Sequence, residues 1–127
     1  MGDLTKNFNR SEFACKCGCG LCNLAPAIPK SCQTIRDALG MALTVNSGAR
    51  CDKHNAKAGG VKGSYHTQGK AADLSCAAGS RTLFLCIVNL CDQGKLPDVE
   101  YVIWYPKKDF VHIDVGKVRK NRFAVSG

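Results

Sequence analysis

The chain has 127 residues, of which 45% are hydrophobic and 22% are charged. These values suit one globular domain spanning residues 1–127, and no run approaches the roughly 20 apolar residues that a membrane-spanning helix needs, so no membrane insertion is expected. The net charge of +8, with a basic concentration at Lys117–Arg122, favours contact with a polyanion (nucleic acid, anionic lipid or an acidic cell-wall polymer), or simply keeps the protein soluble.

The first 30 residues are expected to form a cysteine-rich segment that packs on the rest of the domain. Four of the nine cysteines stand there in "CKCGCGLC", as Cys15, Cys17, Cys19 and Cys22. Thiolates at this density can bind a structural zinc ion, although the spacing is not that of the common Cys-x2-Cys pairs. In a reducing compartment the thiols can also stay free. The odd count leaves at least one cysteine outside any intramolecular disulfide.

The next segment predicts a turn, a helix, a strand and a long loop. Ala25–Lys30 is expected to form the turn. From Ser31 apolar residues recur at three- and four-residue spacing, which predicts a helix to about Leu43. Leu43–Arg50 predicts a short strand followed by a turn. Cys51–Lys70 is rich in Gly, Lys and Asn, so we expect a loop with room for one helical turn, and such long loops are usually functional.

The second half predicts a strand, a helix and a hairpin. Ala71–Ser75 reads as a short buried strand. Ser80 is a suitable N-cap for a helical apolar stripe that Gly94 ends. Val99–Tyr105 and Asp109–Val115 are rich in β-branched and aromatic residues and predict a hairpin. This order predicts an α+β domain with helices packed on one side of a small antiparallel sheet.

The stretch "SYHTQGKAAD" places His66 in the predicted loop and Asp73 on the strand after it. Gly69 lies between them and can take positive φ, so the loop can fold back and bring the two side chains together. A carboxylate in an apolar strand is unfavourable unless it is paired or bound to a metal ion. The spacing by itself leaves chance and a metal site equally open.

The stretch "DFVHIDV" offers a second histidine and aspartate. Strand alternation places Val111, Ile113 and Val115 on one face and His112 and Asp114 on the other. With the apolar face on the core, His112 and Asp114 are either a metal ligand with a neighbouring carboxylate or ordinary solvent-facing residues. Two histidines and one carboxylate form a recognised catalytic zinc set that leaves a fourth position for water.

The motifs S-G-x-R, C-x-x-H-N, G-G, S-x-H-x-x-G-x-A-x-D and F-V-H-I-D-V follow one another between Ser47 and Val115. In this pattern the chain resembles the zinc D-Ala-D-Ala carboxypeptidase family, in its compact single-domain branch. "NFNRSEFACKCGCG" is similar to the amino-terminal segment of that branch, and "YPKKDFVHIDVGKVR" is similar to a segment of the related murein endopeptidases. The resemblance implies the DD-peptidase and hedgehog type of zinc peptidase fold.

The resemblance also implies roles for individual residues. His66, Asp73 and His112 would be the zinc ligands. Arg50 would stabilise the oxyanion of the substrate or hold a substrate carboxylate, tasks that suit a guanidinium group. Ser64 would hydrogen-bond the substrate or orient the site.

The general base of the family is an acidic residue three positions before the last histidine, which is Asp109 in this chain. In an extended strand Asp109 shares the face of Val111, opposite His112, so a turn or bulge would have to re-aim it. Glu100 and Asp114 are the alternative candidates.

Four further residues lie near this pattern. His54 matches the family and is expected to be structural, capping the loop or packing beneath it. Trp104 and Tyr105 either line the cleft or pack within the hairpin. Ala49 stands where the family has an aromatic residue, which is expected to leave room in the pocket.

Together these features predict a zinc-dependent peptidase of peptidoglycan stem or cross-bridge peptides, either a D,D-carboxypeptidase or an endopeptidase of the phage-lysin kind. We expect a monomer without a nucleic-acid partner, made in the cytoplasm without a visible signal peptide and acting on the cell wall. One alternative is a non-catalytic, zinc-containing wall-binding domain of the same fold. The other is a zinc module that binds nucleic acid through its basic surface and holds its metal with Cys15–Cys22.

Overall fold

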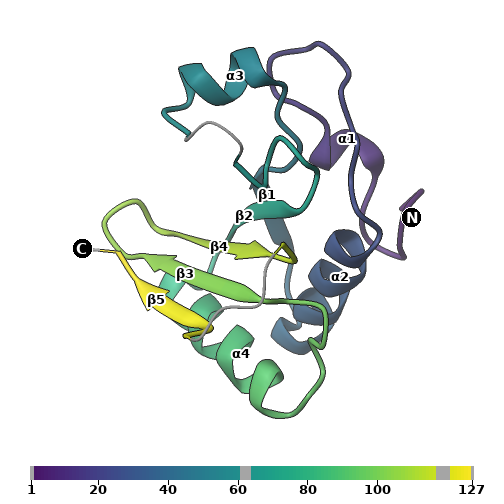
Figure 1. Cartoon of the computed structure of the whole chain (residues 1–127). Helices are drawn as coiled ribbons and strands as arrows, with labels where there is room; N and C mark the ends of the chain where they lie inside the picture. The colour runs from purple at the N-terminus through teal and green to yellow at the C-terminus, as the bar shows by residue number, and fades with distance from the viewer. Residues whose placement is uncertain (1, 61–63, 117–120, 127) are drawn as a thin grey trace.

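The computed structural model describes residues 2–60, 64–116 and 121–126 and is a mixed α+β domain (Figure 1). Most of the basic run at 117–122 lies outside the described residues. The helices are α1 (Arg10–Phe13), α2 (Ala27–Leu39), α3 (Asp52–Lys57) and α4 (Ser80–Asp92). The strands are β1 (Leu43–Ser47), β2 (Ala71–Cys76), β3 (Tyr101–Tyr105), β4 (Phe110–Asp114) and β5 (Phe123–Val125). None of the described helices is long and apolar enough to cross a membrane.

The strands form one sheet in the order β1-β2-β4-β3-β5. The first four run antiparallel to their neighbours, and β3 and β4 form the predicted hairpin. Strand β5 was not predicted; it lies parallel to β3, with Val102 opposite Phe123, so the sheet is mixed rather than wholly antiparallel. The register of the central pair sets Asp73 of β2 directly opposite His112 of β4.

Helices α2 and α4 pack together with one face of the sheet to form the core. The alternation predicted for β4 is present, because Val111 and Ile113 are fully buried while His112 between them is partly exposed. The strands and helices contribute the apolar residues Val45, Leu74, Val102, Ile28, Cys32, Ile35, Leu83, Ile87 and Leu90. The opposite face of β2 and β4 is therefore left for polar residues.

Helix α2 begins and ends four residues earlier than predicted, at Ala27–Leu39 instead of Ser31–Leu43. The expected turn at Ala25–Lys30 is therefore mostly the first turn of the helix. Pro29 falls in that turn, where backbone N–H groups have no intrahelical acceptor, so its missing N–H breaks no helical bond. Gly40, with φ of 68°, ends the helix in the left-handed conformation.

The first backbone N–H of α4 donates a hydrogen bond to a side chain in the turn between β3 and β4. The N-cap of α4 is Gly79, and Ser80, the predicted cap, is the first helical residue. The Ser80 backbone N–H donates to Asp109 Oδ1 at 2.9 Å. The Ser80 hydroxyl accepts a hydrogen bond from Trp104 Nε1 at 2.9 Å, which fixes the hairpin on the helix.

The N-terminal segment packs against the loop that follows β1. Phe8 and Phe13 are buried in the core, and the Phe13 carbonyl accepts the Ala49 N–H at 2.7 Å. Gly48 has no room for a side chain, because a Cβ there would lie 2.5 Å from the Phe13 carbonyl oxygen. The same loop leads into α3, which is the helical turn expected within Cys51–Lys70; residues 61–63 of that loop lie outside the described residues.

Candidate metal centre

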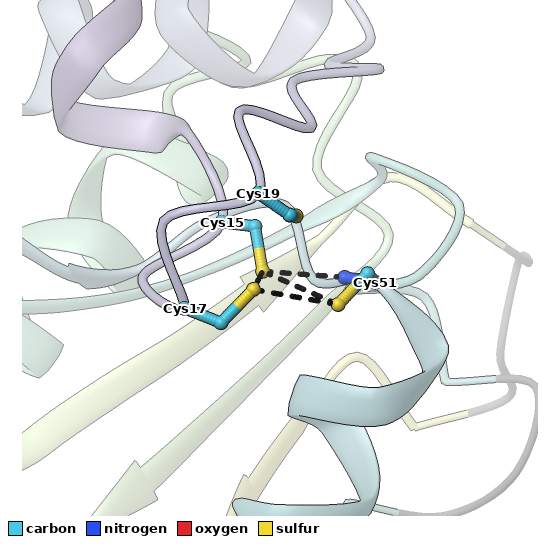
Figure 2. Close-up of side chains that lie close together, drawn as sticks. All are labelled: Cys15, Cys17, Cys19 and Cys51. Atoms are coloured by element: carbon cyan, nitrogen blue, oxygen red, sulfur yellow. Dashed lines mark hydrogen bonds between the residues drawn. The ribbon is translucent and has the colours of Figure 1, made fainter.

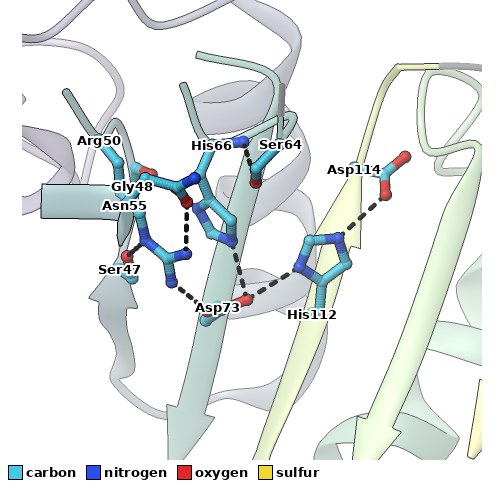
Figure 3. Close-up of polar contacts among 9 residues, drawn as sticks. All are labelled: Ser47, Gly48, Arg50, Asn55, Ser64, His66, Asp73, His112 and Asp114. Carbon is cyan, nitrogen blue, oxygen red and sulfur yellow. Dashed lines mark hydrogen bonds and ion pairs between the residues drawn. The ribbon is translucent and has the colours of Figure 1, made fainter. Parts of the chain in front are cut away.

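His66, Asp73 and His112 converge on the polar face of the sheet (Figure 3). Asp73 and His112 are cross-strand partners, so their side chains leave the sheet on the same side. His66 comes from the turns before β2, where Gly69 takes a φ of 69° and folds the segment back. The convergence that the sequence predicted around this glycine is present in the structure.

One potential ligand atom from each of the three residues lies within 4.8 Å of the other two. Asp73 Oδ1 is 2.9 Å from His112 Nδ1 and 3.3 Å from His66 Nε2. His66 and Asp73 are buried and His112 is partly exposed. Two imidazole nitrogens and a carboxylate oxygen gathered around one point fit a single divalent ion such as zinc.

In both imidazole rings, the nitrogen that faces away from Asp73 has a hydrogen-bond acceptor of its own. His66 Nδ1 is 2.8 Å from the Gly48 carbonyl oxygen. A carbonyl can only accept, so Nδ1 carries a proton in this contact, and Nε2 is the ring nitrogen that faces Asp73. His112 Nε2 is 2.9 Å from Asp114 Oδ2. Metal-binding histidines in proteins are usually oriented by such outer acceptors, so the surroundings fit a metal site as well as the ligand atoms do.

The charges of the centre stabilise one another. Burial alone would lower the pKa of His112, but its hydrogen bonds to Asp114 and Asp73 outweigh burial and raise that pKa to about 9. Burial would likewise raise the pKa of Asp73, and the hydrogen bonds from His112 and His66 hold it below its ordinary value. Binding of a cation at His112 Nδ1 would therefore release a proton.

Arg50, the residue expected to contact substrate, lies beside Asp73. Its Nη2 donates to Asp73 Oδ2 at 3.2 Å. Its Nε donates to Ser47 Oγ at 2.9 Å, and its Nη1 donates to Asn55 Oδ1 at 3.3 Å. These contacts use three of the five guanidinium N–H donors. Because Arg50 occupies Oδ2, Asp73 presents Oδ1 to the two histidines. The sequence patterns assigned no role to Ser47 or Asn55, although both stand in the quoted motifs.

A cavity of about 280 Å³ opens onto the three converging residues. Arg50 and Ser64 line it, together with Tyr105 and Phe110, whose stacked rings have centroids 4.6 Å apart. Ser64 Oγ also accepts the backbone N–H of His66 at 3.2 Å, so this hydroxyl helps to orient the histidine loop. The cavity thus joins the candidate ligands to a guanidinium group and an aromatic wall.

Asp109, the predicted general base, does not point into this cavity. It stands in the turn before β4 with a φ of 57°, and its exposed carboxylate accepts the Ser80 N–H at the start of α4. The turn leaves Asp109 on the side that strand parity indicated and directs its carboxylate at the helix, so Asp109 does not line the cavity, and its role as the base stays a prediction. Neither reserve candidate, Glu100 or Asp114, lines the cavity; among the described residues, Asp73 is the only carboxylate that does.

The other residues named from the sequence take distinct places. Tyr105 lines the cavity, whereas Trp104 lies on the core side, stacked on Phe84 with centroids 5.5 Å apart. Ala49 is buried under the N-terminal segment and does not line the cavity, so it does not provide the expected room. His54 lies in α3, with its N–H directed at the Cys51 sulfur at 3.4 Å.

Two imidazoles and one carboxylate that converge at a cavity on a mixed α+β domain form the arrangement of a metallopeptidase domain. The family model for Peptidase M15 matches residues 6–114, and the chain therefore belongs to this family of peptidases, the zinc D-Ala-D-Ala carboxypeptidase type. The matched region contains all three converging residues and the cysteine-rich N-terminal motif. Comparison with curated proteins finds no match.

Proposed function

We propose that the chain is a zinc peptidase that hydrolyses stem or cross-bridge peptides of bacterial peptidoglycan. The observation that carries this proposal is the convergence of His66, Asp73 and His112, with both outer imidazole nitrogens held by acceptors. Membership of the Peptidase M15 family supports peptide-bond hydrolysis. A zinc ion held by these residues would act as a Lewis acid and lower the pKa of bound water to about 7.

The residues around the ligands would bind and orient the peptide. Arg50 lines the cavity and has N–H donors beyond the three used by its protein acceptors, so it can hold the scissile carbonyl oxygen or a terminal carboxylate. Lys108 adds a second cation to the same wall. Tyr105 and Phe110 present a stacked aromatic surface that would pack against the peptide and exclude water.

The proposed place of action is the cell wall. The net charge of +8 favours retention on anionic wall polymers. The reaction would be either removal of a terminal D-Ala or cleavage within the stem or cross-bridge, by a monomeric enzyme made in the cytoplasm. In this proposal the cavity of about 280 Å³ would hold a short segment of the peptide, with the aromatic rings and the two cations along its sides.

One observation favours a second candidate function. Among the described residues, no carboxylate besides Asp73 lines the cavity, and Asp73 already contacts Arg50 and both histidines. A domain with this site and without a proton acceptor would bind zinc and wall peptides without cleaving them. The second candidate is therefore a non-catalytic, zinc-containing wall-binding domain.

The test combines zinc analysis with digestion of purified peptidoglycan. Wild-type protein is incubated with walls of several cross-bridge types, and released muropeptides are identified by mass spectrometry. We expect new amino termini or free D-Ala, lost in His112→Ala and retained in Arg81→Ala, a change on the exposed surface of α4. Zinc that is lost in His112→Ala, without any released product on all wall types, would overturn the peptidase in favour of the binding domain. Cleavage of ordinary L-peptides only would overturn the peptidoglycan assignment.

A further inference from the structure

Four cysteine side chains gather at a second place in the molecule (Figure 2). Cys15, Cys17 and Cys19 come from the N-terminal loop, and Cys51 is the N-cap of α3. Their sulfur atoms all lie within 4.8 Å of one another. Cys22, the fourth cysteine of "CKCGCGLC", is outside the group, and its Sγ contacts the Arg10 carbonyl. The group therefore joins two segments that are far apart in the sequence.

The spacing of the sulfur atoms is that of ligands around one ion. The Cys15 Sγ lies 3.4 Å from that of Cys17 and 3.8 Å from that of Cys51, and the last two are 3.6 Å apart. Disulfide-bonded sulfur atoms are about 2.05 Å apart, and all nine cysteines are free. Four thiolates about 2.3 Å from one tetrahedral zinc ion have sulfur–sulfur distances of about 3.8 Å.

The backbone around the group is shaped to receive thiolates. Gly18 and Gly20 have φ values of 86° and 82°, which let the loop curl so that alternate cysteines face the same centre. The Cys51 N–H points at the Cys15 sulfur and the His54 N–H at the Cys51 sulfur, each at 3.4 Å. Backbone N–H groups directed at an anionic ligand stabilise its charge and fix its position.

The surroundings also balance the charge of such a centre. Four thiolates around one divalent cation carry an excess of negative charge. Lys53 and Lys57, from the exposed side of α3, line the cavity that adjoins Cys17, Cys19 and Cys51. Two ammonium groups at this edge therefore offset the charge that the thiolates would bring.

From these contacts we infer that Cys15, Cys17, Cys19 and Cys51 bind one zinc ion in a closed, structural site. This centre ties the N-terminal loop to the segment that follows β1. That segment contains Gly48, whose carbonyl orients His66, and Arg50, which holds Asp73. The thiolate centre would thus stabilise the segment whose residues position His66 and Asp73. The inference of this zinc site does not depend on the function proposed for the His66–Asp73–His112 centre.

The test counts zinc ions in matched cysteine variants of the full chain. Protein is made in zinc-supplemented medium and purified under reducing conditions without chelators. We expect about two zinc ions per wild-type chain, and about one in Cys17→Ser. Cys22→Ser is the matched control, because it removes a thiol of the same motif outside the group, and it should keep the wild-type zinc content. His66→Ala should lose the other ion and keep the thiolate-bound one.

X-ray absorption at the zinc edge identifies the ligands without relying on a cysteine variant. In His66→Ala the remaining zinc should show sulfur neighbours only, at about 2.3 Å. Nitrogen and oxygen neighbours there, or full wild-type zinc in Cys17→Ser, would overturn the inference. So would disulfides among these four cysteines, detected by intact mass after thiol alkylation. Failure of the proposed function appears separately, as absent wall digestion or as unchanged zinc content in His66→Ala.

Discussion

Asp114 accepts a hydrogen bond from His112 Nε2 at 2.9 Å, on the side of the ring that faces away from Asp73. The two residues are two positions apart on β4, so strand alternation sets their side chains on one face. Asp114 is only 1% exposed, which makes it a fixed acceptor. This hydrogen bond fixes the orientation of the His112 ring so that Nδ1 faces His66 and Asp73. Asp114 is therefore a positioning residue for the candidate centre.

Removing this acceptor should weaken metal binding. In Asp114→Ala we expect zinc affinity at the histidine centre to fall by about 10–100-fold, the usual effect of losing an outer partner of a metal-bound histidine. Asp114→Asn keeps a carbonyl oxygen for Nε2 and should fall less. Competition with a chromophoric chelator gives the dissociation constant, with circular dichroism to check folding. Equal affinities in wild type and the Ala variant would show that Asp114 does not orient His112.

Asp109 is expected to affect stability rather than catalysis. Asp109→Ala removes the acceptor at the start of α4 and should lower the midpoint of thermal unfolding, while the activity of each folded molecule is retained. Asp109→Asn keeps an acceptor without the charge and should lie between the two. A loss of wall digestion in a folded Asp109→Asn protein would instead restore Asp109 as the general base.

The contact between Asp109 and Ser80 also predicts how the stability of the protein depends on pH. Hydrogen bonds from Ser80 hold the pKa of Asp109 below its ordinary value. A carboxyl whose pKa is lower in the folded state stabilises the fold above its unfolded pKa, and the contribution is lost as pH falls through the folded pKa. The difference in unfolding midpoint between wild type and Asp109→Asn should therefore shrink in acid. A difference that stays constant down to strongly acidic pH would exclude this contribution.

Substitution of Arg50 can separate its two proposed roles, which are the positioning of Asp73 and the binding of substrate. Arg50→Lys keeps a cation and loses the planar fork that contacts Ser47, Asn55 and Asp73. If Arg50 stabilises the oxyanion, wall digestion should fall by about 100-fold or more with zinc content unchanged. Zinc content and digestion rate measured on the same preparation decide this. A parallel loss of both would show that Arg50 acts only by holding Asp73.

The two hairpin aromatics should give opposite results. Trp104→Phe keeps an aromatic ring near Phe84 and loses the hydrogen bond to Ser80, so it should reduce the free energy of unfolding by about 1 kcal/mol. Its digestion of walls should be unchanged. Tyr105→Leu removes a ring that stacks at the cavity and should raise KM with little loss of stability. Urea unfolding and steady-state kinetics on a soluble muropeptide measure the two effects; a raised KM in Trp104→Phe would contradict this division.

The convergence of His66, Asp73 and His112 could be predicted because its signals are local. His66, Gly69 and Asp73 stand within one short stretch, and alternation along β4 sets the face of His112. The α+β class and the hairpin followed from β-branched and aromatic runs, as the structure confirms. The bounds of α2 were less predictable, because a proline can either belong to a turn or occupy the first turn of a helix, and the sequence around Pro29 permits both.

Three other features could not be predicted, because they depend on atoms or distances that residue types do not reveal. The acceptor for His66 is the carbonyl of Gly48, and every residue has a carbonyl. Asp109 matches the family position for the base, yet the φ of 57° in its turn decides where the carboxylate points. Cys51 joins the N-terminal cysteines across a long sequence separation, a pairing that spacing within "CKCGCGLC" cannot indicate.

The close approach of Phe13 to Gly48 has a consequence for which part of the chain a functional fragment must contain. All three converging residues lie after position 65, so a shortened protein that starts at α2 would still carry them. It would nevertheless lack Phe13, whose backbone lies against Gly48 and whose carbonyl holds the Ala49 N–H. Since Gly48 in turn orients His66, we expect the smallest functional fragment to include the N-terminal segment.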